Sequence, residues 1–186
     1  MTARANYVPG AATGAEVRKN GDEWTLILVR DLRQPPAVVW EALTDPNQLR
    51  EWAPFDADRN LGATGPVTLA TVLAPKPQVS TSTVTRADAP TLLEYGWGEN
   101  QMRWELKPHG NGTRLTLWHN IDRKYMAMGA AGWHICLDVL DRFLAGEPVG
   151  RIVGGDAMKF EWKRLNTEYA AQFGMKPESP PSRTAT

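Results

Sequence analysis

Apolar and polar side chains alternate along much of the chain between residues 24 and 121, and this two-residue period is typical of strands that bury one face. The pattern predicts strands at residues 24–30, 67–73, 79–86, 91–97, 101–107 and 113–121. It is interrupted by Pro35-Pro36 and again by Asp45-Pro46, where apolar residues recur at helical spacing instead. Because proline is tolerated in the first turn of a helix, two short helices are predicted there, and the second ends near Trp52.

Turn signals separate the predicted strands. The sequence Gly110-Asn111-Gly112 lies between the last two and is typical of a tight β-hairpin. Consecutive strands joined in this way predict an antiparallel sheet with one buried face.

The strongest helical pattern follows the strands, at residues 126–144, and Asp138 lies off its apolar stripe. The stripe recurs at three- and four-residue spacing and consists of Gly129, Trp133, Cys136, Leu137, Leu140, Phe143 and Leu144. At the α-helical rise, a helix of this length spans ~28 Å, which is enough to cross a sheet of six or seven strands. A final helix is predicted at residues 156–173 and ends at Gly174.

The pattern outside this region divides the chain into three parts. Residues 1–22 are polar and small and are interpreted as a mobile N-terminal arm. Residues 23–174 are interpreted as a single domain, and residues 175–186, which are rich in Pro and Ser, as a disordered tail.

Composition excludes several classes of protein. The 21 basic and 21 acidic side chains balance, so no net positive charge favours nucleic acid or an anionic membrane surface. No apolar run approaches the ~20 residues of a membrane-spanning helix, and no apolar segment follows the N-terminus as in a secretory signal. Cys136 is the single cysteine, which excludes an internal disulfide and a multi-cysteine metal site. We therefore expect a cytoplasmic protein without a cofactor or a metal.

Eight tryptophans are the unusual feature of the composition. The inward face of the predicted sheet is rich in Trp, Tyr, Leu and Met, and His119 and threonine hydroxyls are its polar groups. A long helix on a curved sheet can leave an apolar cavity at one end, which would suit an apolar ligand. A fully packed core is the alternative, and periodicity alone favours it.

Four stretches of the sequence together resemble a known family. They are residues 36–46 with Leu49 and Trp52, residues 84–97, residues 105–117, and residues 132–148. In this order they resemble the START-like (SRPBCC) superfamily, in the branch related to the C-terminal domain of the activator of the Hsp90 ATPase. The resemblance covers residues 24–174.

This resemblance implies an α+β helix-grip fold, in which a curved antiparallel sheet wraps around a long C-terminal helix, here followed by an extra helix. Members of the superfamily bind hydrophobic molecules, and some are cyclases or hydratases. The eukaryotic activator uses an additional N-terminal domain against its chaperone. Because only 22 residues precede the first predicted strand here, that domain is not expected.

A ligand-binding site is predicted between the sheet and the long helix. Its predicted lining consists of Tyr95, Trp97, Trp104, Leu106, Leu117, His119, Trp133, Leu137 and Leu140. Tryptophan and tyrosine each supply a large apolar area and one polar group. His119 is the candidate for orienting the polar end of the ligand, although a hydrogen-bonded interior histidine is the competing interpretation.

Other reactive residue types are assigned structural roles. His134 is placed at the rim of the helix stripe, and His109 in an exposed turn. Asp56 and Asp58 are interpreted as a solvated loop, since a pair of carboxylates without a third ligand is a weak metal signal. Cys136 lies on the apolar stripe and is interpreted as a small buried side chain.

The proposed activity is therefore binding of a small hydrophobic molecule, and an enzyme is the less favoured hypothesis. One alternative is an enzyme of the cyclase or hydratase type that acts on an aromatic or polyketide-like substrate. Another is a chaperone-associated interaction module, for which a filled interior and an exposed apolar patch are expected. A homodimer through Phe160 and Trp162 of the final helix is left open, because the same side chains could pack on their own sheet.

Overall fold

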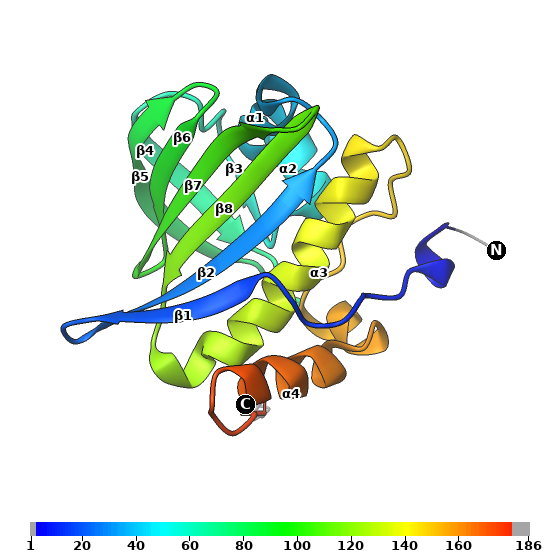
Figure 1. The fold of residues 1–186 in the computed structure, drawn as a ribbon. Coiled ribbons are helices and arrows are strands. Elements are labelled where there is room, and N and C mark those ends of the chain that lie inside the picture. The colour runs from blue at the N-terminus through cyan, green and yellow to red at the C-terminus, as the bar shows by residue number, and fades with distance from the viewer. Residues whose placement is uncertain (1–2, 180–186) are drawn as a thin grey trace.

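An eight-stranded antiparallel sheet curves around one long helix in the computed structural model, which describes residues 3–179 (Figure 1). The strands are β1 (Ala15–Asn20), β2 (Glu23–Leu32), β3 (Phe55–Ala57), β4 (Gly65–Thr71), β5 (Gln78–Asp88), β6 (Leu92–Trp97), β7 (Asn100–His109) and β8 (Gly112–Asn120). Their order across the sheet is β1-β2-β8-β7-β6-β5-β4-β3. The predicted α+β helix-grip fold is confirmed.

The helices are α1 (Pro36–Thr44), α2 (Pro46–Trp52), α3 (Met126–Leu144) and α4 (Trp162–Gln172), with the short 3-10 helices η1 (Ala3–Asn6), η2 (Arg123–Tyr125) and η3 (Gly154–Lys159). Helix α3 crosses the concave face of the sheet, and α4 packs on the other side of α3 (Figure 1). No helix within residues 3–179 is long and apolar enough to cross a membrane.

Local sequence explains why the first two helices begin where they do. Pro36 occupies the first turn of α1, and Pro46 that of α2. The Asp45 carboxylate accepts hydrogen bonds from the backbone N–H groups of Asn47 and Gln48, at 2.7 and 3.2 Å, and so caps α2.

The hairpin between β7 and β8 is also the predicted one. Gly110 adopts the left-handed φ of 57° that a tight turn of this kind needs. A Cβ atom at Gly112 would collide with the carbonyl oxygen of Leu32, so only glycine fits at the start of β8.

The alternating pattern identifies the buried face of the central strands correctly. In β7 the side chains of Met102, Trp104 and Leu106 are buried, and in β8 those of Leu115 and Leu117. Together with α3 they form the centre of the hydrophobic core.

The pattern did not predict two strands. Strand β1 lies at one edge of the sheet and is mostly exposed, so its sequence carries no apolar alternation. Residues 15–20, at the end of the segment interpreted as an N-terminal arm, pair with β2. Strand β3 has only three residues.

The final helix is shorter than predicted. Residues 154–159 form η3, and α4 begins only at Trp162. Glu161 separates them with a left-handed φ of 58°, which an α-helix cannot contain. Trp162 is buried and Phe160 contacts Tyr7 at 5.7 Å between ring centroids, so both pack on their own chain and give no argument for a dimer.

Candidate functional site

The residues of the predicted ligand site lie together in the core between the sheet and α3. Strand β6 contributes Tyr95 and Trp97, strand β7 Trp104 and Leu106, strand β8 Leu117 and His119, and α3 Trp133, Leu137 and Leu140. All of them are buried except Trp97, which is half-buried.

Aromatic rings pack against one another at this place. We call Trp52, Phe55, Tyr95, Trp97, Trp104, His119 and Trp133 the aromatic cluster. The indole of Trp133 is at its centre, with edge-on contacts to Trp104 at 5.5 Å and to Trp97 at 5.8 Å between ring centroids. Trp97 also stacks on the imidazole of His119 at 5.7 Å. These geometries are the favourable ones for aromatic pairs, so the rings stabilise one another.

The indole N–H groups of Trp52, Trp97 and Trp104 all have acceptors. Trp104 Nε1 donates to the Tyr95 hydroxyl oxygen at 3.1 Å, and Trp97 Nε1 donates to Thr71 Oγ1 at 2.8 Å. Trp52 Nε1 donates to a backbone carbonyl oxygen of α1 at 2.9 Å. Sequence reasoning missed the role of Thr71, because no pattern within β4 shows which side chain of β6 it meets.

His119 is the exception to this full pairing. Its Nδ1 accepts a hydrogen bond from Trp133 Nε1 at 3.1 Å, whereas its Nε2 is buried and has no partner within the described residues. Burial lowers the pKa of His119 to about 4, so the ring is neutral near pH 7. The competing interpretation, a fully hydrogen-bonded interior histidine, therefore holds for Nδ1 but not for Nε2.

Trp97 is the member of the cluster that reaches solvent. It is the last residue of β6, and the turn formed by Gly98 and Glu99 follows it directly. Its indole covers His119 and Trp133 from this end of the sheet.

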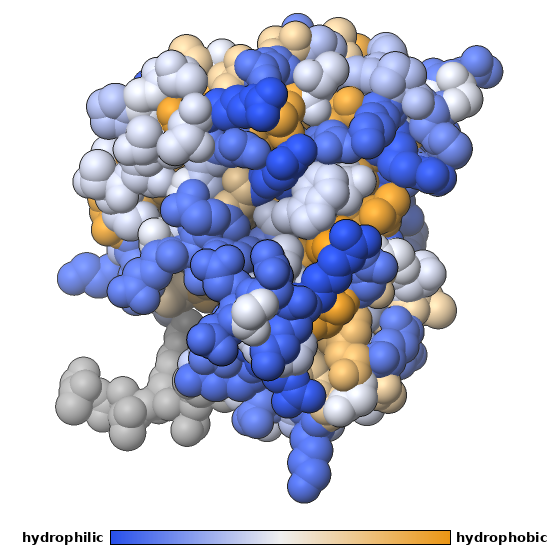
Figure 2. Space-filling view, turned by 60° about the vertical axis from the view of Figure 1, so that its left-hand side comes forward, coloured by the Kyte–Doolittle hydropathy of each residue, from blue (hydrophilic) through white to orange (hydrophobic). Residues whose placement is uncertain are grey.

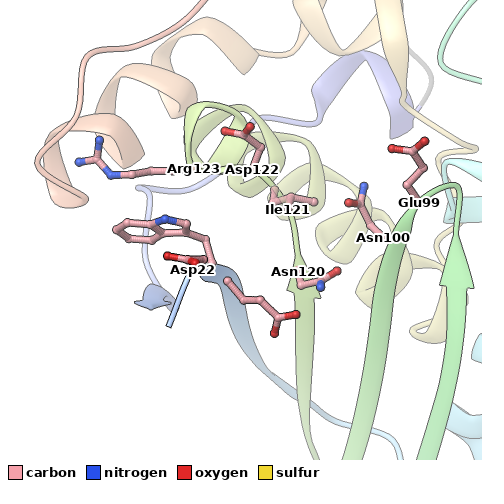
Figure 3. Close-up of a pocket in the computed structure, with 9 residues that line it drawn as sticks. Asp22, Glu99, Asn100, Asn120, Ile121, Asp122 and Arg123 are labelled. Carbon is pink, nitrogen blue, oxygen red and sulfur yellow. The ribbon is translucent and has the colours of Figure 1, made fainter. Parts of the chain in front are cut away.

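A surface pocket of about 430 Å³ lies at the same end of the sheet (Figure 3). Its lining comes from the β1–β2 turn, the start of β7, the end of β8 and η2, and consists of Asp22, Glu23, Trp24, Glu99, Asn100, Asn120, Ile121, Asp122 and Arg123. A second pocket of about 370 Å³ lies between β1 and the residues at the end of α4. Neither pocket is lined by a residue of the predicted ligand site. The aromatic rings pack against one another in the core where an apolar cavity was expected.

The prediction for His134 was wrong. This side chain is buried rather than at a rim, because α4 and the N-terminal residues cover that side of α3. His134 Nδ1 is hydrogen-bonded to the Tyr169 hydroxyl at 2.8 Å, and its Nε2 lies 3.4 Å from a carboxylate oxygen of Asp138. His109 is exposed, as predicted.

The other reactive side chains have structural surroundings. Asp56 pairs with Arg151, and Asp58 accepts a hydrogen bond from the backbone N–H of Thr68 at 2.9 Å. Cys136 is buried, and burial raises the pKa of its thiol to about 12, which leaves it unreactive as a nucleophile. Within residues 3–179, no three His, Cys, Asp or Glu side chains are grouped so that they could hold a metal ion.

Comparison with known proteins decides the family. Residues 33–145, more than half of the chain, match the family described as Activator of Hsp90 ATPase homolog 1-like protein (AHSA1). The chain belongs to this family. The predicted resemblance to the AHSA1-like branch of the SRPBCC superfamily is confirmed, and no curated protein matches the chain.

Solved structures share the AHSA1-like fold at low sequence identity. CalU16 from Micromonospora echinospora is 22% identical, with a TM-score of 0.60 over 89% of this chain and 98% of that chain. A conserved protein of unknown function from Enterococcus faecalis, EF2215, is 17% identical, with a TM-score of 0.63 over 85% of this chain and 89% of that chain. An AHSA1-like protein from Aeromonas hydrophila is 20% identical, with a TM-score of 0.52 over 66% of this chain and 92% of that chain. At these identities the likeness establishes the fold alone.

Proposed function

We propose that this AHSA1-like protein binds a small, largely apolar molecule between the sheet and α3. The proposed lining is the predicted one, from Tyr95, Trp97 and Trp104 on the sheet to Trp133, Leu137 and Leu140 on α3. The observation that carries the proposal is the position of Trp97, which is the partly exposed member of an otherwise buried cluster. A ligand would enter by displacing this one side chain.

The cost of displacing Trp97 is compatible with binding. The movement breaks one hydrogen bond, to Thr71, and three ring contacts, to Phe55, His119 and Trp133. At about 1 kcal/mol for each of these, the open form lies about 4 kcal/mol above the closed form and makes up roughly 0.1% of the molecules. A ligand whose ring replaces the indole would recover the ring contacts, so the closed structure lowers the affinity without preventing binding.

Titration with N-phenyl-1-naphthylamine, a neutral apolar dye, tests the proposal. We expect saturable binding to the wild-type protein and its loss in Leu137→Trp, which places a larger side chain in the proposed lining on α3. Trp118→Ala is the matched control, because Trp118 lies on the other face of β8 and stacks with Arg103. Dye binding that is unchanged in Leu137→Trp would contradict the proposal.

A second measurement uses the wild-type protein alone and needs no variant. Mass spectrometry of the native protein is expected to reveal a copurifying apolar molecule, in a complex that dissociates on unfolding. We also expect dye binding to quench the tryptophan fluorescence through energy transfer, because four tryptophans belong to the aromatic cluster. A protein that contains no small molecule and does not bind the dye would exclude this function.

An interaction module associated with a chaperone is the second candidate, and the filled interior favours it. The exposed apolar side chains are weaker support for this candidate, because they come from separate elements of the chain. They are Val8, Val38, Leu73, Val79, Tyr125 and Met158. On the face seen in Figure 2, hydrophilic side chains predominate and apolar ones lie between them in small groups. A chaperone that increases its ATPase rate on addition of this protein, together with no dye binding, would establish this alternative.

A further inference from the structure

We propose that the ligand of this site is a neutral aromatic or conjugated molecule with a carbonyl-type oxygen, and that this oxygen accepts a hydrogen bond from His119 Nε2–H. The inference rests on the function proposed above and adds the chemical class of the ligand. It is carried by a donor in the aromatic cluster that the protein itself leaves without an acceptor.

The neighbouring tryptophan fixes which nitrogen of His119 carries the hydrogen. The indole N–H of Trp133 can only donate, and it points at His119 Nδ1 at 3.1 Å. Nδ1 must therefore be the unprotonated nitrogen of the ring. In a neutral imidazole the single N–H is then at Nε2, so Nε2 is a donor.

A charged imidazolium does not fit this environment. It would place an N–H at Nδ1, directly against the N–H of Trp133. The low pKa of His119, which results from burial, agrees with this geometry. The donor at Nε2 is thus a neutral one near pH 7.

The protein offers no acceptor to this donor. His119 is only 4% exposed, and Nε2 has no hydrogen-bond partner within the described residues. Buried N–H groups almost always have an acceptor, so an unpaired one in a site lined by aromatic rings points to a group that arrives with a ligand.

The surroundings of Nε2 select among ligand groups. A cationic amine would meet an N–H and no counter-charge, and a ligand that only donates would leave Nε2 unpaired. A carboxylate would be buried beside a neutral donor without a cation, which is costly. A neutral oxygen acceptor on a flat ring satisfies Nε2 and stacks on the indole of Trp133 or Trp97.

Two probes of nearly the same shape test the inference. 2-Acetylnaphthalene has a carbonyl oxygen where 2-isopropenylnaphthalene has a CH₂ group. We expect the ketone to bind the wild-type protein at least tenfold more tightly, as measured by calorimetry or by quenching of tryptophan fluorescence. His119→Phe is expected to abolish the preference, whereas His119→Gln, which keeps an N–H donor near the position of Nε2, is expected to retain part of it.

The outcomes separate this inference from the function on which it rests. If both probes bind the wild-type protein equally, the acceptor requirement is wrong and the binding function stands. If neither probe binds, the binding function fails and the inference with it.

Nitrogen NMR of the wild-type protein checks the inference without any variant. We expect His119 to show a protonated Nε2 and an unprotonated Nδ1, and the Nε2 signal to shift on addition of the ketone but not of the hydrocarbon. A proton found on Nδ1 instead, or an Nε2 signal that the ketone leaves in place, would overturn the assignment.

Discussion

Two buried histidines face α3 or lie on it, and their surroundings differ. His119 belongs to the aromatic cluster on the sheet side of the helix. His134 belongs to a second group on the opposite side, which we call the polar cluster and which consists of Tyr7, Arg30, His134, Asp138 and Tyr169. The first histidine has one unpaired nitrogen, and the second has a partner at each nitrogen.

The polar cluster ties four parts of the chain together. Asp138 of α3 accepts a hydrogen bond from the Tyr7 hydroxyl at 2.8 Å and lies 3.7 Å from Arg30 of β2. The Tyr169 hydroxyl of α4 is bonded to His134 and donates to the backbone carbonyl oxygen of Thr13 at 3.0 Å. This cluster therefore fastens the N-terminal residues and α4 onto α3.

The difference in hydrogen bonding indicates different roles for the buried polar groups of the two clusters. In the polar cluster, the two tyrosines, His134 and Asp138 satisfy one another, and Arg30 Nη2, which has no hydrogen-bond partner within the described residues, lies 3.7 Å from the Asp138 carboxylate. In the aromatic cluster, one donor stays free in apolar surroundings. We therefore assign stability to the polar cluster and ligand recognition to the aromatic one, and the following predictions test that division.

The largest effect is expected from Asp138→Ala. The change removes the partner of Tyr7 and His134 and leaves their polar atoms buried. Breaking a largely buried pair in this way destabilises a protein by about 3 kcal/mol, which urea unfolding would measure. Asp141→Ala is the matched control on the same helix, since the Asp141 carboxylate is 41% exposed and lies 3.9 Å from Arg33; its expected cost is below about 0.5 kcal/mol. Equal losses in the two variants would refute the stabilising role.

The pH dependence of stability is expected to report on His119. Its pKa falls from 6.5 to about 4 on folding, so between these values the unfolded chain binds more protons than the folded one. Stability is therefore complete above pH 6.5 and decreases as the pH falls towards 4, by about 3 kcal/mol in total. Urea unfolding of the wild-type protein and of His119→Phe over this range isolates the effect, because the variant lacks the titrating group. An identical pH dependence in both would contradict the burial of a neutral imidazole.

The carboxyl group of Asp138 is expected to act at lower pH. Although burial opposes this, the hydrogen bonds from His134 and Tyr7 and the charge of Arg30 hold its pKa below the usual range. A carboxyl group of this kind adds stability above its unfolded pKa of about 3.9, and the contribution is lost as the pH falls through the lower folded value. The two clusters should thus lose stability in successive pH ranges, the aromatic cluster first.

Much of the aromatic cluster was predictable from the sequence, because it rests on two simple periods. The two-residue period of β7 and β8 places Trp104 and His119 on the inner face, and the helical period of α3 places Trp133 opposite them. Periodicity tells which side chains point inward. It does not tell whether their volumes fill the space, and here the rings do.

The polar cluster was not predictable in this way. Asp138 lies off the apolar stripe of α3, yet it is covered because Tyr7, 131 residues away in sequence, reaches its carboxylate. The unpaired Nε2 of His119 depends on a contact with Trp133, which lies 14 residues further along and on another element. Contacts of this kind follow from tertiary packing and leave no local pattern.

A smaller loss is expected from Tyr7→Phe, which removes one hydrogen bond to Asp138 and keeps the ring. The expected cost is about 1 kcal/mol. Hydrogen exchange at the backbone amide of Ala12, which donates to Glu168 at 2.9 Å, should become faster as the N-terminal residues loosen. Dye binding at the aromatic cluster should not change, since Tyr7 lies on the other side of α3. A change in dye affinity would mean that the two clusters are coupled.

The smallest effect on stability is expected from Thr71→Val, which removes the acceptor of the Trp97 indole while it preserves the shape of the side chain. Water can replace the lost acceptor because Trp97 is partly exposed, so the cost should be below about 1 kcal/mol. The same change stabilises the displaced position of Trp97 relative to the closed one. Acrylamide should therefore quench the fluorescence of Trp97 more strongly, and the dye should associate several-fold faster with little change in its dissociation rate. Thr68→Val on the same strand is the control. Faster association of the dye with both variants would show that displacement of Trp97 does not control entry to the site.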